Sequence, residues 1–182
     1  MKKIALIFGG IAGLICAGMF FLIHPGDNAA IDMDQGMIIG YATMIISLSS
    51  IFFAVKQYRD HQLGGTISFG NAFLLGILIT LVASVVYVLA WEVYYANFAS
   101  DFMDKYLQQQ QNQWVESGMS TAEIEKKVAD QQDMMDLYRD NFAFRMGMTF
   151  LEIFPVGLLI SLICGLIFGV FLKKKPEGAV LE

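Results

Sequence analysis

Four long apolar runs alternate with polar segments along the chain. They cover residues 4–23, 37–55, 72–91 and 147–172, and none of them contains lysine or arginine. A hydrocarbon core about 30 Å thick takes about 20 helical residues, so each run is long enough to cross a bilayer. The pattern predicts an all-α fold, a polytopic four-helix membrane bundle, as a single membrane domain over residues 1–182.

The segment after the third run keeps a helical pattern beyond the predicted membrane. Aromatic residues recur at spacings of three and four after Trp91, and the glutamine-rich stretch 108–113 contains no helix breaker. Gly118 predicts a turn, and Ser120 with Glu123 predicts a capping box that begins the next helix. We expect the third and fourth helices to extend unbroken into an antiparallel helical hairpin over residues 93–145, about 35 Å tall.

Turn residues predict the other helix ends. Pro25 follows the first run, and Gly64-Gly65 can end the second helix in a left-handed conformation. Ser68 can cap the third helix through the backbone of Asn71.

Composition agrees with the membrane assignment, and the distribution of charge adds an orientation. The chain is 56% hydrophobic and 16% charged, with a mean hydropathy of +0.55. In a four-pass arrangement one side receives the cations of both termini and of the loop between the second and third runs, and the charged residues of the short loop between the first and second runs are all acids. These cations are Lys2, Lys3, Lys56, Arg59 and Lys173–Lys175, and the acids are Asp27, Asp32 and Asp34. The positive-inside rule predicts cytoplasmic N and C termini and a hairpin on the opposite face. The first run is too long for a signal peptide, so we expect it to stay as a helix.

Small residues recur every four positions in three of the runs. Such stripes let neighbouring helices approach closely, within one chain or in a homo-oligomer. The helix-packing positions that we predict are Ala5, Gly9, Gly13, Ala17, Gly76, Gly157, Ser161, Gly165 and Gly169.

The candidate polar residues lie near the outer ends of the third and fourth runs. Glu152 is an acid within a predicted span, and Pro155 beside it predicts a kink because it lacks the amide that Leu151 would bind. A hairpin that turns at Gly118 pairs residues whose numbers total about 237, which sets Glu92 against Arg145. A second estimate counts residues along the third and fourth runs from their predicted cytoplasmic ends. This estimate sets Glu92 at the same depth in the membrane as Glu152. We expect a cluster of Glu92, Arg145 and Glu152, and two interpretations remain open: structural pairing, or binding of a proton or cation.

The sequence carries no pattern for an enzyme, a metal or a cofactor. Cys16 and Cys164 each lie inside an apolar run, and His24 and His61 fall on opposite sides of the predicted membrane. Known catalytic and phosphate-binding motifs are absent from the sequence. The predicted cytoplasmic segments are short and hold few cations, so we expect no nucleic-acid partner.

Two stretches carry a resemblance to a known family. They run from Tyr58 to Phe73, with Gly64-Gly-Thr-Ile-Ser-Phe-Gly-Asn-Ala-Phe at their centre, and from Thr149 to Ile163. With the four-span layout they resemble the DUF4199 family of small integral membrane proteins of Bacteroidetes-type bacteria. The resemblance implies a bacterial inner membrane and a periplasmic hairpin. The function of the family is unknown, so it assigns no residue a role.

Two functions from different classes fit these features. The first is a non-enzymatic accessory or scaffold subunit that acts through its hairpin and small-residue faces on a periplasmic or membrane protein partner. The alternative is a small proton- or cation-coupled transporter or channel-like protein that uses Glu152. A water-filled cavity that reaches Glu152 would favour the alternative.

Overall fold

The computed structural model describes residues 1–22 and 33–172, and over these residues it is all-helical. The predicted turn at Pro25, the acids Asp27 and Asp32, and the cations Lys173–Lys175 lie outside the described residues.

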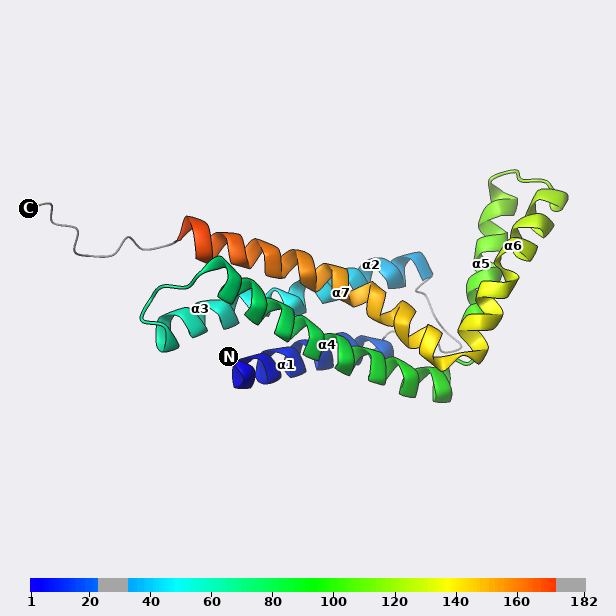
Figure 1. The fold of residues 1–182 in the computed structure, drawn as a ribbon. Helices are drawn as coiled ribbons and strands as arrows, with labels where there is room; N and C mark the ends of the chain where they lie inside the picture. The colour runs from blue at the N-terminus through cyan, green and yellow to red at the C-terminus, as the bar shows by residue number, and fades with distance from the viewer. Residues whose placement is uncertain (23–32, 173–182) are drawn as a thin grey trace, which may run out of the picture.

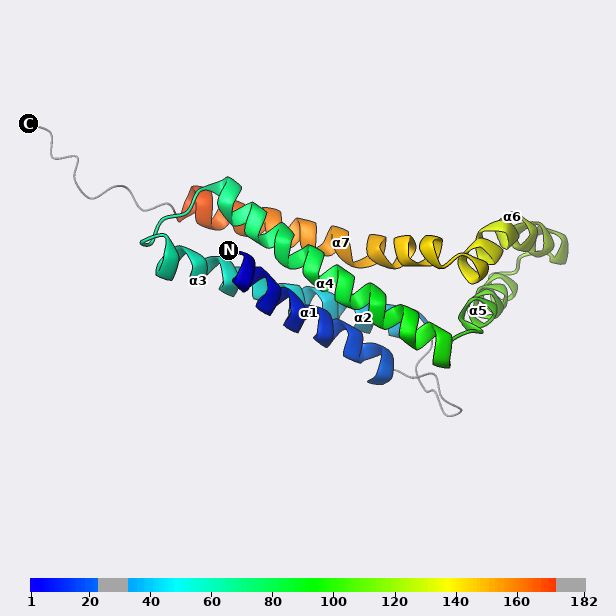
Figure 2. The same ribbon diagram turned by 60° about the horizontal axis from the view of Figure 1, so that its bottom comes forward.

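Four helical rods form an elongated bundle (Figures 1 and 2). They are α1 (Lys2–Leu22), α2 (Met33–Leu48) with α3 (Ser50–Gln62), α4 (Phe69–Phe98), and α7 (Phe142–Leu166) continued by the π-helix η1 (Ile167–Phe171). Each rod is long and apolar enough to cross a membrane. Large apolar side chains also point outward, as in Ile46, which is 74% exposed. An apolar exterior is what lipid contact requires, so the architecture fits a membrane protein.

The helix α4 is the centre of the bundle because it packs on α1 along one side and on α7 along the other. Its sequence is apolar all round, as expected of a helix with several buried faces. The fully buried Leu75 and Ile79 belong to the main core, together with Ile51 of α3 and Ile153 of α7.

The second rod is longer than predicted and is interrupted once. The helix α2 ends at Leu48 and α3 begins at Ser50. Between them, the Ser49 hydroxyl donates a 2.6 Å hydrogen bond to the Ile45 carbonyl. Serine that bonds to the preceding turn in this way often bends a helix. Beyond this point α3 runs past the predicted end at residue 55 and contains both Lys56 and Arg59.

The turns and caps predicted at Gly64-Gly65, Ser68, Gly118 and Ser120 are confirmed. Gly64, Gly65 and Gly118 have φ angles of 65°, 90° and 80°, in the left-handed region that glycine adopts easily. The Ser68 hydroxyl accepts from the Asn71 amide. Ser120 and Glu123 form the reciprocal capping box.

A hairpin is present, but the prediction of unbroken helices was wrong. The antiparallel helices α5 (Phe102–Glu116) and α6 (Thr121–Asp140) are separate elements, and they turn sharply away from the bundle axis in Figure 1. The Arg139 guanidinium of α6 and the Asp104 carboxylate of α5 form a 2.7 Å ion pair between them. The arms have 15 and 20 residues, so they are unequal. At 1.5 Å per residue they measure about 22 and 30 Å, shorter than the predicted 35 Å.

The breaks lie at residues 99–101 and at Asn141, which together we call the junction, and neither contains glycine or proline. Asn141 is extended at φ −112° and ψ 101°, and its side-chain oxygen accepts from the Phe144 amide, capping α7. Asparagine, serine and aspartate compete with the helix for backbone hydrogen bonds. These helix ends therefore carry neither of the two residues, glycine and proline, from which breaks were predicted.

Candidate functional site

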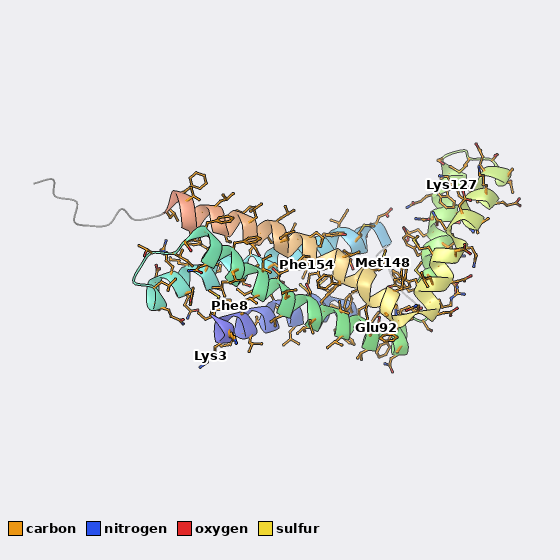
Figure 3. The ribbon with its side chains drawn as sticks, in the orientation of Figure 1. Lys3, Phe8, Glu92, Lys127, Met148 and Phe154 are labelled. Atoms are coloured by element: carbon orange, nitrogen blue, oxygen red, sulfur yellow. The ribbon has the colours of Figure 1, made fainter. Side chains whose placement is uncertain are left out.

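Glu92 and Arg145 form an ion pair where the bundle meets the hairpin. The Arg145 Nη2 lies 2.7 Å from Glu92 Oε2, and its Nε lies 2.9 Å from Oε1. The Arg145 side chain is only 9% exposed, and the Glu92 side chain is only 20% exposed. The two-pronged contact fixes the guanidinium plane, which a single hydrogen bond could not do. This geometry joins α4 to α7 near the end of α4, where Figure 3 labels Glu92.

The same guanidinium also completes the end of α6. Arg145 Nη1 donates to the carbonyls of Tyr138 at 2.9 Å and Arg139 at 3.1 Å. The last carbonyls of a helix have no partner within it, so a cation there satisfies them and offsets the negative end of the helix dipole. Arg145 therefore contacts α4 and α6 from its own position in the first turn of α7.

Aromatic rings enclose this ion pair. The guanidinium carbon of Arg145 lies 4.1 Å from the centre of the Tyr95 ring, close enough for a cation–π contact. Trp91 donates its indole N–H to the Tyr138 hydroxyl at 2.9 Å. Burial raises the pKa of Tyr138 above its usual range, so the hydroxyl stays neutral as it accepts this bond. The aromatic packing joins α6 to α4 and stabilises the hairpin against the bundle.

Glu152 does not join this ion pair. Its Oε2 accepts a 3.3 Å hydrogen bond from the Tyr87 hydroxyl. Glu152 lies seven positions after Arg145 on the same helix, about 10 Å along the axis. No hydrogen bond or ion pair between Glu152 and Arg145 exists in the described part of the chain. The expected three-residue cluster is thus two separate sites: Glu92 with Arg145, and Tyr87 with Glu152.

The antiparallel register at the junction continues down the whole α4–α7 interface. A Cβ on Gly76 would lie 2.6 Å from the Ser161 hydroxyl, and a Cβ on Gly157 would collide with the Thr80 side chain. Thr80 and Ser161 hydroxyl oxygens lie 3.4 Å apart. The Gly76–Ser161 and Thr80–Gly157 contacts agree with the total of about 237, and they disagree with depth counted from the cytoplasmic ends, which set Glu92 level with Glu152.

The other predicted packing residues lie at the same kind of crossing. A Cβ on Gly9 would lie 2.6 Å from the Ile79 carbonyl of α4, and one on Gly13 would meet Val86. Gly165 and Gly169 lie against Phe69 of α4. Ala5 and Ala17 are buried in α1. The stripes therefore hold the chain's own helices together.

Pro155 lies inside α7, and the helix continues through it. Its missing N–H leaves the Leu151 carbonyl without the usual helical partner. Leu151 is 63% exposed on the outside of the bundle.

The surface of the described residues includes one groove beside α7 and another beside α3. One of about 270 Å³ lies between α4 and α7 and is lined only by apolar residues and glycine, among them Val85, Met146 and Phe150. The other, of about 520 Å³, lies between α1 and α3. Glu152 lines neither groove. No group of three histidine, cysteine or acidic side chains is placed to hold a metal ion within the described residues.

The aromatic partners of Arg145 and Glu152 were not predicted from the sequence. Tyr87, Trp91 and Tyr95 lie on buried faces of α4, at spacings of four from one another. In the register in which facing residue numbers total about 237, these aromatic residues lie opposite the first turns of α7, close to Glu152. That register, applied to the aromatic positions of α4, could have predicted these contacts.

A family model described as a protein of unknown function, DUF4199, matches residues 7–169. The chain belongs to the DUF4199 family. The match covers both stretches that carry the resemblance and also the hairpin between them. No curated protein and no solved structure matches this DUF4199 chain. The family model assigns no activity, so a function for this DUF4199 protein has to be argued from its own geometry.

Proposed function

We propose that this DUF4199 protein is a non-enzymatic accessory or scaffold subunit that binds a partner protein through the α5–α6 hairpin. The observation that carries the proposal is the way Arg145 fixes this hairpin to the bundle. A merely connecting loop would need no buried ion pair and no aromatic packing at its base. A surface held at a fixed angle loses less conformational freedom when a partner binds, and this favours binding.

The hairpin has apolar side chains available for such contact. Val115, Met134 and Leu137 are 62%, 49% and 42% exposed, and all three lie outside the candidate spans. The hairpin is also acidic, with eight acidic and four basic residues between 102 and 140. A partner surface with basic residues around an apolar centre would complement it. The small-residue stripes are occupied within the chain, so the hairpin is the better surface for a partner.

We place the protein in the bacterial inner membrane, with both termini cytoplasmic and the hairpin periplasmic. Lys2 and Lys3 of α1 lie at the end of the bundle opposite the hairpin, as do Lys56 and Arg59 of α3 (Figure 1). The positive-inside rule supports this orientation.

Shortening the hairpin tests the proposal. Residues 108–131 would be replaced by a short Gly-Ser turn and the exposed Met134 and Leu137 by serine, which leaves Arg145, Tyr138 and the Asp104–Arg139 ion pair in place. After purification from native membranes in mild detergent, we expect the shortened chain to fold and to lose a stoichiometric partner that the full chain retains. The control is Lys56→Gln, a single charge change on the exposed surface of α3 away from the hairpin, which should retain the partner. Retention of the partner by the shortened chain would contradict the proposal.

The Tyr87–Glu152 contact favours a second function, a proton- or cation-coupled transporter. Glu152 is an acid within a candidate span, and its partner is a neutral hydroxyl and not a cation. Acids in such positions are functional hypotheses by default. Against this, neither groove reaches it. Proton and cation flux into vesicles containing the full chain would test this function: loss of flux in Glu152→Gln, with assembly unchanged, supports transport, and unchanged flux excludes it.

A further inference from the structure

The groove between α1 and α3 combines an apolar floor with polar side chains at its edge. Ile4, Ile7 and Phe8 of α1 line it from one side, and Gln57, His61 and Gln62 of α3 line it from the other, with Lys3 at the end of α1. Figure 3 labels Lys3 and Phe8 on α1, near the end of the bundle at which α3 also ends. Its volume of about 520 Å³ falls within the range of about 300–1,000 Å³ of small-molecule sites.

The lining of the groove contains a lysine and no acid. Lys3 lines it, and Lys2 and Lys56 are exposed on the same two helices. The nearest acid along α3, Asp60, is bound to the Arg59 side chain at 2.7 Å. Arg59 in turn lies 5.0 Å from the Phe168 ring, so it is directed toward η1. The groove therefore has the cation Lys3 and no acidic side chain in its lining.

We propose that this groove binds one anionic phospholipid, with an acyl chain along Ile4, Ile7 and Phe8 and the headgroup phosphate at Lys3. Basic pockets between membrane helices recognise such headgroups through charge, while the apolar floor takes a chain that any phospholipid has. Gln57, Gln62 and His61 supply N–H donors for the phosphate oxygens. The site lies away from the hairpin and from Glu152, so it does not depend on the proposed function.

The groove between α4 and α7 is an internal comparison. It has an apolar lining with no charged or polar side chain. We expect this groove to bind acyl chains of any phospholipid, whatever the headgroup. Comparing the two grooves therefore separates recognition of the headgroup charge from general contact with lipid.

Native mass spectrometry of the full chain tests the proposal. Delipidated protein in mild detergent would receive equal amounts of phosphatidylglycerol and phosphatidylcholine. We expect one phosphatidylglycerol bound in preference, and Lys3→Gln to lower that preference roughly fivefold, the effect of one cation near a lipid headgroup. The matched control Lys126→Gln removes a cation from the hairpin and leaves the preference unchanged.

A second variant keeps the test independent of charge and of folding defects. Gln57→Trp places a large ring at the groove and is expected to displace the bound lipid, whereas Val85→Trp in the other groove leaves the phosphatidylglycerol preference intact. Equal binding of the two lipids, or equal preferences in Lys3→Gln and Lys126→Gln, would overturn the proposal. So would a dimer that forms without lipid preference, because a second copy would then be the occupant.

Discussion

Arg145 of α7 contacts two other helices, α4 and α6, through one guanidinium, and removing the side chain leaves a group on each of them unsatisfied. Glu92 would keep a charge that is only 20% exposed, and the carbonyls of Tyr138 and Arg139 would lose their donor. Breaking a buried ion pair from one side costs about 3–5 kcal/mol. Partial exposure of Glu92 to water places this pair at the low end of that range.

We therefore predict that Arg145→Gln lowers the free energy of unfolding in detergent by about 3 kcal/mol. The double variant Glu92→Gln/Arg145→Gln removes the uncompensated charge as well, so its loss should be smaller than that of Arg145→Gln alone. A denaturant titration monitored by circular dichroism measures both. A loss below about 1 kcal/mol in Arg145→Gln, typical of a surface pair, would be at odds with this account.

Gly9 and Gly10 are adjacent but have opposite surroundings. A Cβ on Gly9 would lie 2.6 Å from the Ile79 backbone carbonyl, whereas one on Gly10 would meet nothing within 4 Å. Gly9→Ala should lower stability by about 1–3 kcal/mol through overpacking. Gly10→Ala should leave it unchanged or raise it by up to about 1 kcal/mol through helix propensity. The same titration compares them, and equal effects would show that α1 does not pack on α4 as described.

At the scale of the elements, the junction depends on helix caps. The Asn141 side chain accepts from the Phe144 amide at 3.1 Å. Asn141→Ala removes this cap, at a cost of about 1 kcal/mol. Alanine also favours a continuous helix from α6 into α7. We expect a wider range of hairpin angles, seen as a broader spin-label distance distribution between Lys126 on α6 and Ile46 on α2.

Asn97→Ala is the matched control. Asn97 donates to the Val93 carbonyl of its own helix and caps nothing, so the distance distribution should stay as in the unchanged protein. If Asn141→Ala also leaves it unchanged, the angle is set by other contacts.

The capping box of α6 predicts a dependence on pH. The Glu123 carboxylate accepts from the Ser120 hydroxyl at 2.6 Å and from the Ser120 amide at 3.0 Å. The hydrogen bond from the Ser120 side chain, followed by that from its backbone, lowers the pKa of Glu123. The cap is fully present above the ordinary pKa of about 4.3, and it is lost as pH falls through the lowered folded value.

Hydrogen exchange, corrected for its intrinsic pH dependence, should show protection of the first turn of α6 falling below about pH 4. In Glu123→Gln this pH dependence should disappear, and Glu125→Gln, at an exposed acid in the same helix, should keep it. A pH response that survives in Glu123→Gln would assign the effect to another group.

Local sequence patterns were sufficient for the helices and for most of their ends. The spans follow from uninterrupted apolar runs, and Ser68, Gly118 and Ser120 act through neighbours in the sequence. The junction was not predictable in this way. Asn141 ends one helix and begins another within the surroundings of Arg145 and Tyr138, whose positions depend on the folded bundle.

At the scale of the whole molecule, the hairpin register, in which facing residue numbers total about 237, predicted the ion-paired part of the candidate site. The hairpin register sets Glu92 opposite Arg145, and these residues pair in the structure. Glu152 was associated with them by a depth estimate, which assumed that both helices begin at the same level. The hydrogen bond from Tyr87 to Glu152 fits the same register and lies further from the hairpin than the ion pair does.

The central claim is that the hairpin is the binding surface for a partner protein. A photoreactive amino acid at Met134, 49% exposed on the hairpin, tests it in living cells, with Ile46, 74% exposed on the bundle, as the comparison. The account predicts one discrete cross-linked protein from position 134 that is weakened by Arg145→Gln and absent from position 46. No discrete product from position 134, or the same product from both positions, would contradict it.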